Sequence, residues 1–217
     1  MLLVHRVVKP RLPSERPPLL LLLHGIGADE QDLLPLAREF DPRFLVLAVR
    51  APAEAEPMGY RWYAIDFSVS PPRGDPAEIE RSRDLLARFV EEAREAYGTD
   101  PSRTLLFGFS QGAIMSLALL LARPDLVRGV VAHSGRLARL SGPTPTPEAL
   151  SRVEALVLHG TEDELVPEEQ GRKAYEVLRG LLGERASYRA FPGLGHGISE
   201  ESAGLAARWL TARIDAG

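Results

Sequence analysis

One stretch of the sequence is typical of a single class of fold: Thr104-Leu-Leu-Phe-Gly-Phe-Ser-Gln-Gly-Ala-Ile-Met-Ser-Leu-Ala-Leu-Leu120. An apolar run at 104–107 leads into the pentapeptide Gly108-Phe-Ser-Gln-Gly112, and a second apolar run follows. This order predicts a strand that turns sharply into a helix and presents Ser110 at the turn, an arrangement known as a nucleophile elbow. The two glycines suit such a turn because they leave room between the strand and the helix.

Similar apolar runs recur along the chain and predict further strands. The seven predicted strands lie at 2–8, 19–23, 44–49, 104–107, 127–132, 155–159 and 187–191. Five helices are predicted between them, at 30–39, 76–97, 111–122, 168–182 and 200–214. Alternating strands and helices indicate an α/β fold with a mostly parallel sheet that helices cover on both faces. We expect a turn to join the first two strands and to pair them antiparallel at one edge.

Composition limits the classes of protein to which the chain can belong. Its 217 residues, 45% of them hydrophobic, suit one domain that spans 1–217. The net charge is −4 and acids and bases are mixed along the chain, so we expect no nucleic-acid partner. The chain has no cysteine, which excludes disulfides, a thiol nucleophile and cysteine-ligated metals. No P-loop, dinucleotide-binding or HExxH motif is found, and we expect neither a cofactor nor a metal.

The amino terminus is predicted to be a strand rather than a targeting segment. Residues 1–8 have no basic leader and no small-residue cleavage site. The most apolar run, at 19–23, is too short to cross a bilayer. We therefore expect a cytoplasmic protein without stable membrane insertion.

A nucleophilic serine needs a base, and the base needs an orienting carboxylate. His196 lies in the glycine-rich segment 191–197, between the last predicted strand and the last helix. Asp163 follows the sixth strand, and the chain order Ser, acid, His is the one found in folds with a nucleophile elbow. Glu162 and Glu164 flank Asp163, and the alternative interpretation of this acidic run is a solvated loop.

The developing oxyanion of such a reaction needs two backbone N–H donors. Gln111, directly after the serine, is one candidate. The second is Ile26 in the loop His24-Gly-Ile-Gly27, whose glycines allow the backbone to curl toward Ser110. We expect His24 itself to brace this loop.

Two further segments bear on the site. Residues 51–75 are rich in proline and aromatic side chains and are predicted to form a wall of the substrate pocket, the alternative being a flap that only packs on the core. Residues 141–150, with three prolines, are interpreted as a surface connection, and a pocket rim is the alternative.

Four blocks of sequence together resemble one known family. They are 24–33 (HGIGADEQDL), 108–113 (GFSQGA), 159–167 (HGTEDELVP) and 193–196 (GLGH), in this order. They are similar to the phospholipase/carboxylesterase family of α/β-hydrolases, which includes acyl-protein thioesterases and lysophospholipases. The resemblance implies a triad of Ser110, Asp163 and His196, oxyanion donors at Ile26 and Gln111, no cofactor, and hydrolysis of esters or thioesters.

The resemblance also has departures. Thioesterase members usually carry Asp where this chain has Ala28, and their Trp-aromatic-Asp run is here interrupted as Trp62-Tyr-Ala-Ile-Asp66. These differences favour the bacterial carboxylesterase branch. Trp62 is carried over from the family as an acyl-pocket residue.

The sequence thus predicts a serine carboxylesterase that acts on a small-molecule ester or acyl substrate, as a monomer or a homodimer. The same three residues would serve an acyl thioesterase, a lysophospholipase or a peptidase, and these remain alternatives. A binding module that has kept the fold without the chemistry is the alternative from another class.

Overall fold

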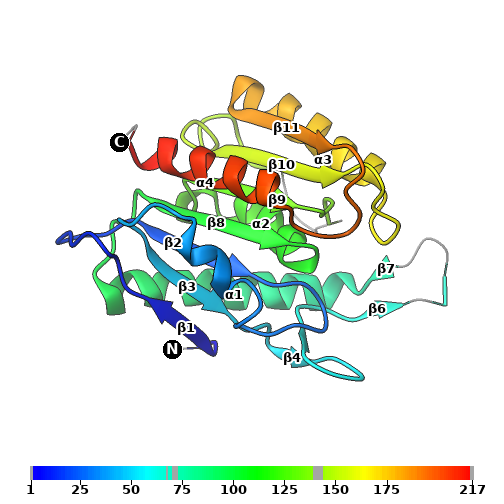
Figure 1. The fold of residues 1–217 in the computed structure, drawn as a ribbon, viewed down its shortest axis with the longest axis horizontal. Helices are drawn as coiled ribbons and strands as arrows, with labels where there is room; N and C mark the ends of the chain where they lie inside the picture. Colours follow the sequence, from blue (N-terminus) through cyan, green and yellow to red (C-terminus); the bar gives the residue numbers. More distant parts are fainter. Residues whose placement is uncertain (1, 67, 70–72, 139–143, 216–217) are drawn as a thin grey trace.

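Seven strands form one central sheet in the computed structural model, whose described residues are 2–66, 68–69, 73–138 and 144–215. The order across the sheet is β1-β3-β2-β8-β9-β10-β11 (Figure 1). All neighbours are parallel except β1 and β3. Their bounds are β1 His5–Val8, β2 Leu19–Leu23, β3 Leu45–Val49, β8 Thr104–Phe109, β9 Gly129–His133, β10 Glu154–Gly160 and β11 Ala186–Phe191. The predicted seven-stranded, mostly parallel sheet is confirmed.

The expected pairing of the first two strands is wrong. β1 pairs antiparallel with β3, with His5 opposite Val49, and not with β2. Every side chain of β2 is a buried leucine, so this strand suits the interior of the sheet, where β3 and β8 take both of its edges. Arg6 and Val7 of β1 are exposed, as suits an edge strand.

Helices cover both faces of the sheet. α1 (Pro76–Tyr97), α2 (Gln111–Ala122) and α3 (Glu168–Leu182) pack on one face, and α4 (Glu200–Asp215) packs on the other, where Figure 1 shows it in front of the sheet. Alternate leucines of β2 belong to the two cores: Leu19, Leu21 and Leu23 to one, Leu20 and Leu22 to the other. The sheet is therefore buried on both sides, as the continuous apolar runs indicate.

One predicted helix, 30–39, is mostly absent. Only a short 3-10 helix, η1 (Leu34–Arg38), forms there. Pro35 has no N–H for an α-helical hydrogen bond in this segment. The Glu30 side chain, which a surface helix would expose, is buried and bonds Arg50 at 2.5 and 2.8 Å. That bond lowers the pKa of the Glu30 carboxyl and fixes the chain after the loop at 24–27.

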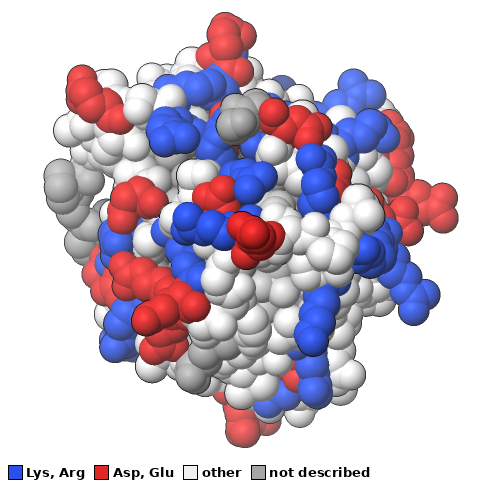
Figure 2. All heavy atoms as spheres, turned by 90° about the vertical axis from the view of Figure 1, so that its left-hand side faces the viewer, with Lys and Arg blue, Asp and Glu red and all other residues white. Residues whose placement is uncertain are grey.

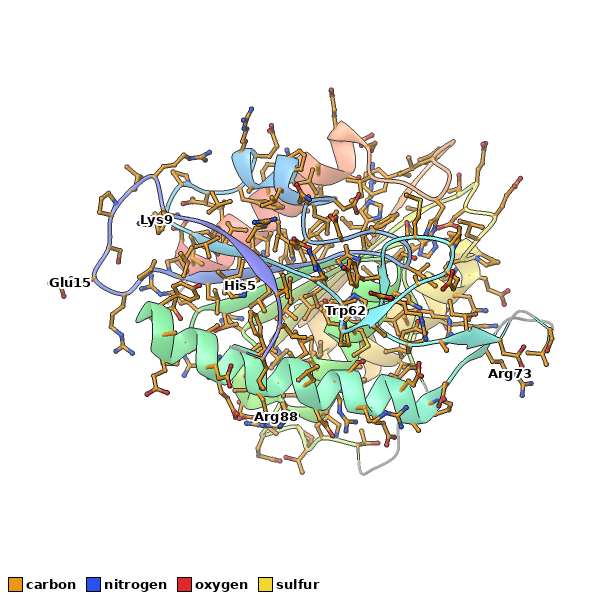
Figure 3. All side chains as sticks on the ribbon, turned by 90° about the horizontal axis from the view of Figure 1, so that it is seen from below. His5, Lys9, Glu15, Trp62, Arg73 and Arg88 are labelled. Carbon is orange, nitrogen blue, oxygen red and sulfur yellow. The ribbon has the colours of Figure 1, made fainter. Side chains whose placement is uncertain are left out.

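The remaining elements are short. They are β4 (Ala53–Glu54), β5 (Tyr60–Arg61), β6 (Ile65–Asp66), β7 (Arg73–Gly74), η2 (Pro124–Leu126) and η3 (Gly183–Arg185). The β6–β7 ribbon projects from the body, with Arg73 far out along it, whereas Trp62 lies within the body (Figure 3). Of 51–75, residues 67 and 70–72 lie outside the described part, as do 141–143 of the connection 141–150, whose last residue Leu150 is buried.

The surface mixes both signs of charge. Figure 2 looks onto the end of the molecule where the parallel strands begin, and basic and acidic side chains alternate across it. Within the described residues, no helix has the length and apolar character needed to cross a membrane.

Candidate active site

The predicted turn at Ser110 is present, and its geometry explains both glycines. Ser110 has φ 55° and ψ −117°, which is strained for a residue with a side chain, and it lies between β8 and α2. A Cβ on Gly112 would lie 1.9 Å from the carbonyl oxygen of Leu23 in β2, and one on Gly108 would lie 2.3 Å from the Gly112 oxygen. Only glycine fits at either position, so strand and helix can meet closely enough to hold Ser110 at the turn.

The structure brings Ser110, His196 and Asp163 together from three loops at the carboxyl edge of the sheet. Ser110 Oγ lies 3.0 Å from His196 Nε2, and His196 Nδ1 lies 2.7 Å from Asp163 Oδ2. Because Nδ1–H donates to the carboxylate, Nε2 of the neutral ring is free to accept the Ser110 hydroxyl proton. The side chain of Asp163 is fully buried and that of His196 is 14% exposed.

The carboxylate of Asp163 is held on both of its oxygens. Oδ1 accepts the backbone N–H groups of Leu165 and Val166 at 3.0 and 2.8 Å, and Oδ2 faces His196. The two backbone N–H groups fix the orientation of the carboxylate in the loop. The acidic run is therefore more than a solvated loop: Glu162 and Glu164 point to solvent, and Asp163 points inward.

The glycine loop after β2 runs beside the serine. A Cβ on Gly25 would lie 3.2 Å from the Ser110 Cβ, so the loop that carries Ile26 passes directly beside the serine. Among the residues that the structure describes, the backbone N–H groups of Ile26 and Gln111 have no hydrogen-bond partner. Two unpaired N–H groups flanking a serine are the arrangement that an oxyanion hole needs.

His24 braces this loop, as the sequence predicts. Its Nδ1–H donates to the carbonyl of Gly25 at 2.6 Å, and its Nε2 accepts the N–H of Ala51 at 3.0 Å. These two bonds require the neutral ring with its proton on Nδ1. Burial lowers the pKa of His24 and so maintains this form.

Trp62, which the family resemblance places in the acyl pocket, packs between two segments of the site. Its side chain is 1% exposed and its indole N–H donates to the carbonyl of His24 at 3.0 Å. Its backbone N–H donates to Gln111 Oε1, and Gln111 Nε2 donates to the carbonyl of Tyr63, both at 2.9 Å. Trp62 thus lies behind the loop at 24–27. It connects this loop, through the side chain of Gln111, to the turn at Ser110. Its partners are about 40 to 50 residues away in the chain, so no local signal could have revealed this role.

Trp62→Phe is expected to lower kcat and leave KM nearly unchanged. The variant leaves the His24 carbonyl without its indole donor, and a loop displaced by about 1 Å can cost up to about a hundredfold in rate. Steady-state kinetics on a p-nitrophenyl ester would measure the effect. Trp209→Phe is the matched control, because the Trp209 indole N–H is buried in α4 and has no partner among the described residues. Equal losses in both variants would contradict the bracing role.

The buried histidine at the end of β9 predicts an acid-sensitive fold. Burial, with weaker contributions from neighbouring charges, lowers the pKa of His133 from 6.5 to about 3. Its ring nitrogens contact the Ser134 and Ser202 hydroxyls at 3.1 and 2.9 Å. Below pH 6.5 the unfolded chain binds a proton here that the folded chain does not, so the stability present above this pH is lost as pH falls toward about 3.

Denaturant unfolding between pH 7 and pH 4 would measure this loss. We expect the free energy of unfolding to fall with a contribution of about 1.4 kcal/mol per pH unit from His133. His133→Gln removes the titrating group, so the free energy of unfolding of this variant is expected to fall less steeply as the pH is lowered. An equally steep fall in the variant would assign the acid sensitivity to other groups.

Comparison with known proteins identifies the family of the chain. Residues 4–214 match the phospholipase/carboxylesterase family. The chain belongs to this family. Esterase YpfH of Escherichia coli (strain K12) is 31% identical over 207 residues, which are 91% of this chain and 83% of that protein. Acyl-protein thioesterase 1 of Schizosaccharomyces pombe is 34% identical over 145 residues, which are 65% of this chain and 63% of the relative.

Solved structures give the same result. The crystal structure of esterase PE8 superposes with a TM-score of 0.82 at 27% identity and covers 97% of this chain and 98% of its own. A carboxylesterase from Mesorhizobium loti gives a TM-score of 0.77 at 26% identity, with 97% and 95% covered. The α/β-hydrolase fold predicted from the elbow is therefore that of solved esterases.

Proposed function

We propose that this chain is a serine carboxylesterase in which Ser110, His196 and Asp163 form the catalytic triad. Membership of the phospholipase/carboxylesterase family makes it a carboxylic ester hydrolase, and the residue roles are our addition. The observation that carries the proposal is the continuous path from Ser110 Oγ to His196 Nε2, at 3.0 Å, and from His196 Nδ1 to Asp163 Oδ2, at 2.7 Å.

Acylation begins when His196 Nε2 takes the hydroxyl proton of Ser110 as Oγ attacks the ester carbonyl carbon. The carbonyl oxygen becomes an oxyanion, which the N–H groups of Ile26 and Gln111 stabilise. His196 then gives its proton to the departing alcohol, and the acyl group remains on Ser110. A water molecule, activated by the same imidazole, hydrolyses the acyl-enzyme and restores the serine.

Asp163 stabilises the imidazolium that forms in both steps. Its buried, ionised carboxylate faces Nδ1, so the positive charge on His196 develops next to a fixed negative charge in a site of low dielectric. The carboxylate also keeps the ring in the tautomer in which Nε2 can accept a proton.

Thioester hydrolysis is the second candidate. The relatives include proteins named acyl-protein thioesterase, and the same triad attacks a thioester carbonyl by the same steps. A thiol then leaves in place of an alcohol, and the acyl-enzyme on Ser110 is the same for both substrates.

Hydrolysis of p-nitrophenyl esters from acetate to palmitate tests the proposal. We expect a burst of p-nitrophenol that matches the amount of enzyme, and covalent labelling of Ser110 by a fluorophosphonate. Matched ester, thioester and amide substrates of one acyl chain then rank the three chemistries. Absence of both hydrolysis and labelling would reject the proposal and favour a binding module.

A further inference from the structure

A second histidine lies against the carboxylate of Asp163. His159, near the end of β10, places its Nε2 2.7 Å from the carbonyl oxygen of Val166 and 3.3 Å from Asp163 Oδ2. The side chains of His159 and Asp163 are both fully buried. Oδ2 therefore faces two imidazoles, one from His196 at 2.7 Å and one from His159.

The surroundings of His159 determine where its proton lies. Nε2 has two acceptors in front of it, the Val166 carbonyl and the Asp163 carboxylate, so Nε2 carries a hydrogen. Nδ1 is buried and has no hydrogen-bond partner among the described residues. The Nε2–H of His159 is thus directed at the loop that carries Asp163.

Helix α3 fixes the position of this ring from the other side. A Cβ on Gly171 would lie 2.2 Å from His159 Nδ1 and 3.0 Å from Cγ, so α3 can pack here only through a glycine. The imidazole is held between α3 and the 163–166 loop. Any side chain at 171 would push it toward the carboxylate or displace the helix.

We infer that His159 is a positioning residue of the triad: its Nε2–H holds the 163–166 loop so that Asp163 Oδ2 faces His196. The inference rests on the triad proposed above. His159 touches neither the substrate nor Ser110 in this arrangement and transfers no proton. Its bond to the Val166 carbonyl closes the turn whose N–H groups bind Oδ1, and its contact with Oδ2 limits rotation of the carboxylate.

Two matched pairs of variants test the inference. His159→Met removes the donor and keeps a long apolar side chain, whereas His159→Gln keeps an N–H at about the reach of Nε2. Gly171→Ala inserts a methyl group against the ring, whereas Gly180→Ala makes the same change on the same helix, where a Cβ would meet nothing within 4 Å. Each variant is first checked for thermal unfolding, so that misfolded protein is excluded.

We expect His159→Met and Gly171→Ala to lower kcat by up to about a hundredfold with little change in KM, as displacement of a catalytic group does. His159→Gln is expected to recover most of the activity, and Gly180→Ala to match the wild type. A methionine variant as active as the wild type, or a glutamine variant as impaired as the methionine one, would overturn the inference.

A second readout separates this inference from the proposed function. The His196 Nδ1–H that bonds Asp163 should give a far-downfield proton NMR signal, which needs no substrate. We expect the signal in the wild type and in His159→Gln, and its loss or displacement in His159→Met and Gly171→Ala. An unchanged signal in all variants overturns the role of His159. Absence of ester hydrolysis by a wild type that has the signal would instead reject the function.

Discussion

Ser110→Ala is expected to lower kcat by about 10⁶, as removal of the nucleophile does in other serine hydrolases. The variant loses the only atom that can form the acyl-enzyme, and His196 then has no hydroxyl proton to accept. The fold is expected to survive, because the Ser110 side chain has a single hydrogen bond, the one to His196, in the described structure. Kinetics on a short p-nitrophenyl ester, together with thermal unfolding, would measure both effects.

Residual activity is part of this prediction. The N–H groups of Ile26 and Gln111 are backbone groups that the substitution leaves in place, so a water molecule can still attack a carbonyl polarised by them. The variant is therefore expected to hydrolyse the ester slowly and without a burst, and to resist fluorophosphonate. A variant of near-normal activity would show that Ser110 is not the nucleophile.

Asp163→Asn is expected to lower kcat by about 10⁴ at neutral pH, as the same change does in a serine protease triad. Oδ1 of residue 163 accepts two backbone N–H groups, so the amide oxygen of asparagine would keep that place. Its NH₂ group would then occupy the position of Oδ2, facing His196 Nδ1 and the Nε2–H of His159. His196 would have to move its proton to Nε2, where it can no longer accept one from Ser110.

The neighbouring acids provide the control. Glu162→Gln and Glu164→Gln remove the same charge from the same loop, but both side chains are exposed. We expect both variants to retain wild-type kcat. A loss in either that equals the loss in Asp163→Asn would show that the net charge of the loop, rather than one placed carboxylate, matters.

Local patterns in the sequence predict those elements whose geometry depends on residues that are close together in the chain. The helix predicted at 76–97 is an example: Pro76 is its first residue, and the Asp75 carboxylate accepts the N–H groups of Ala77 and Glu78. The elbow follows from Gly108 and Gly112, whose close contacts are with adjacent strand and helix. Chain order then selects Asp163 and His196, which the fold brings to one edge.

Long-range partners could not be predicted. No pattern in β1 indicates that it pairs with β3 instead of β2, and no pattern in 30–39 indicates that Glu30 turns inward to Arg50. In the sequence His159 is only the last residue of a predicted strand. Its contact with Asp163 forms only when the 163–166 segment folds back on that strand. The hydrogen bonds of Trp62 could not be predicted for the same reason, because they depend on what packs around the indole.

The hydrogen bonds of the Gln111 side chain indicate which segments of this enzyme can be redesigned and which cannot. Its amide forms hydrogen bonds with the backbone of Trp62 and Tyr63. These bonds join the chain behind the loop at 24–27 to the first residue of α2. The chain after Tyr63 continues into the β6–β7 ribbon, where Figure 3 shows Arg73 away from the body of the protein. The β6–β7 ribbon can therefore be varied in length and composition while the hydrogen bonds that join 111 to 62 and 63 are left in place.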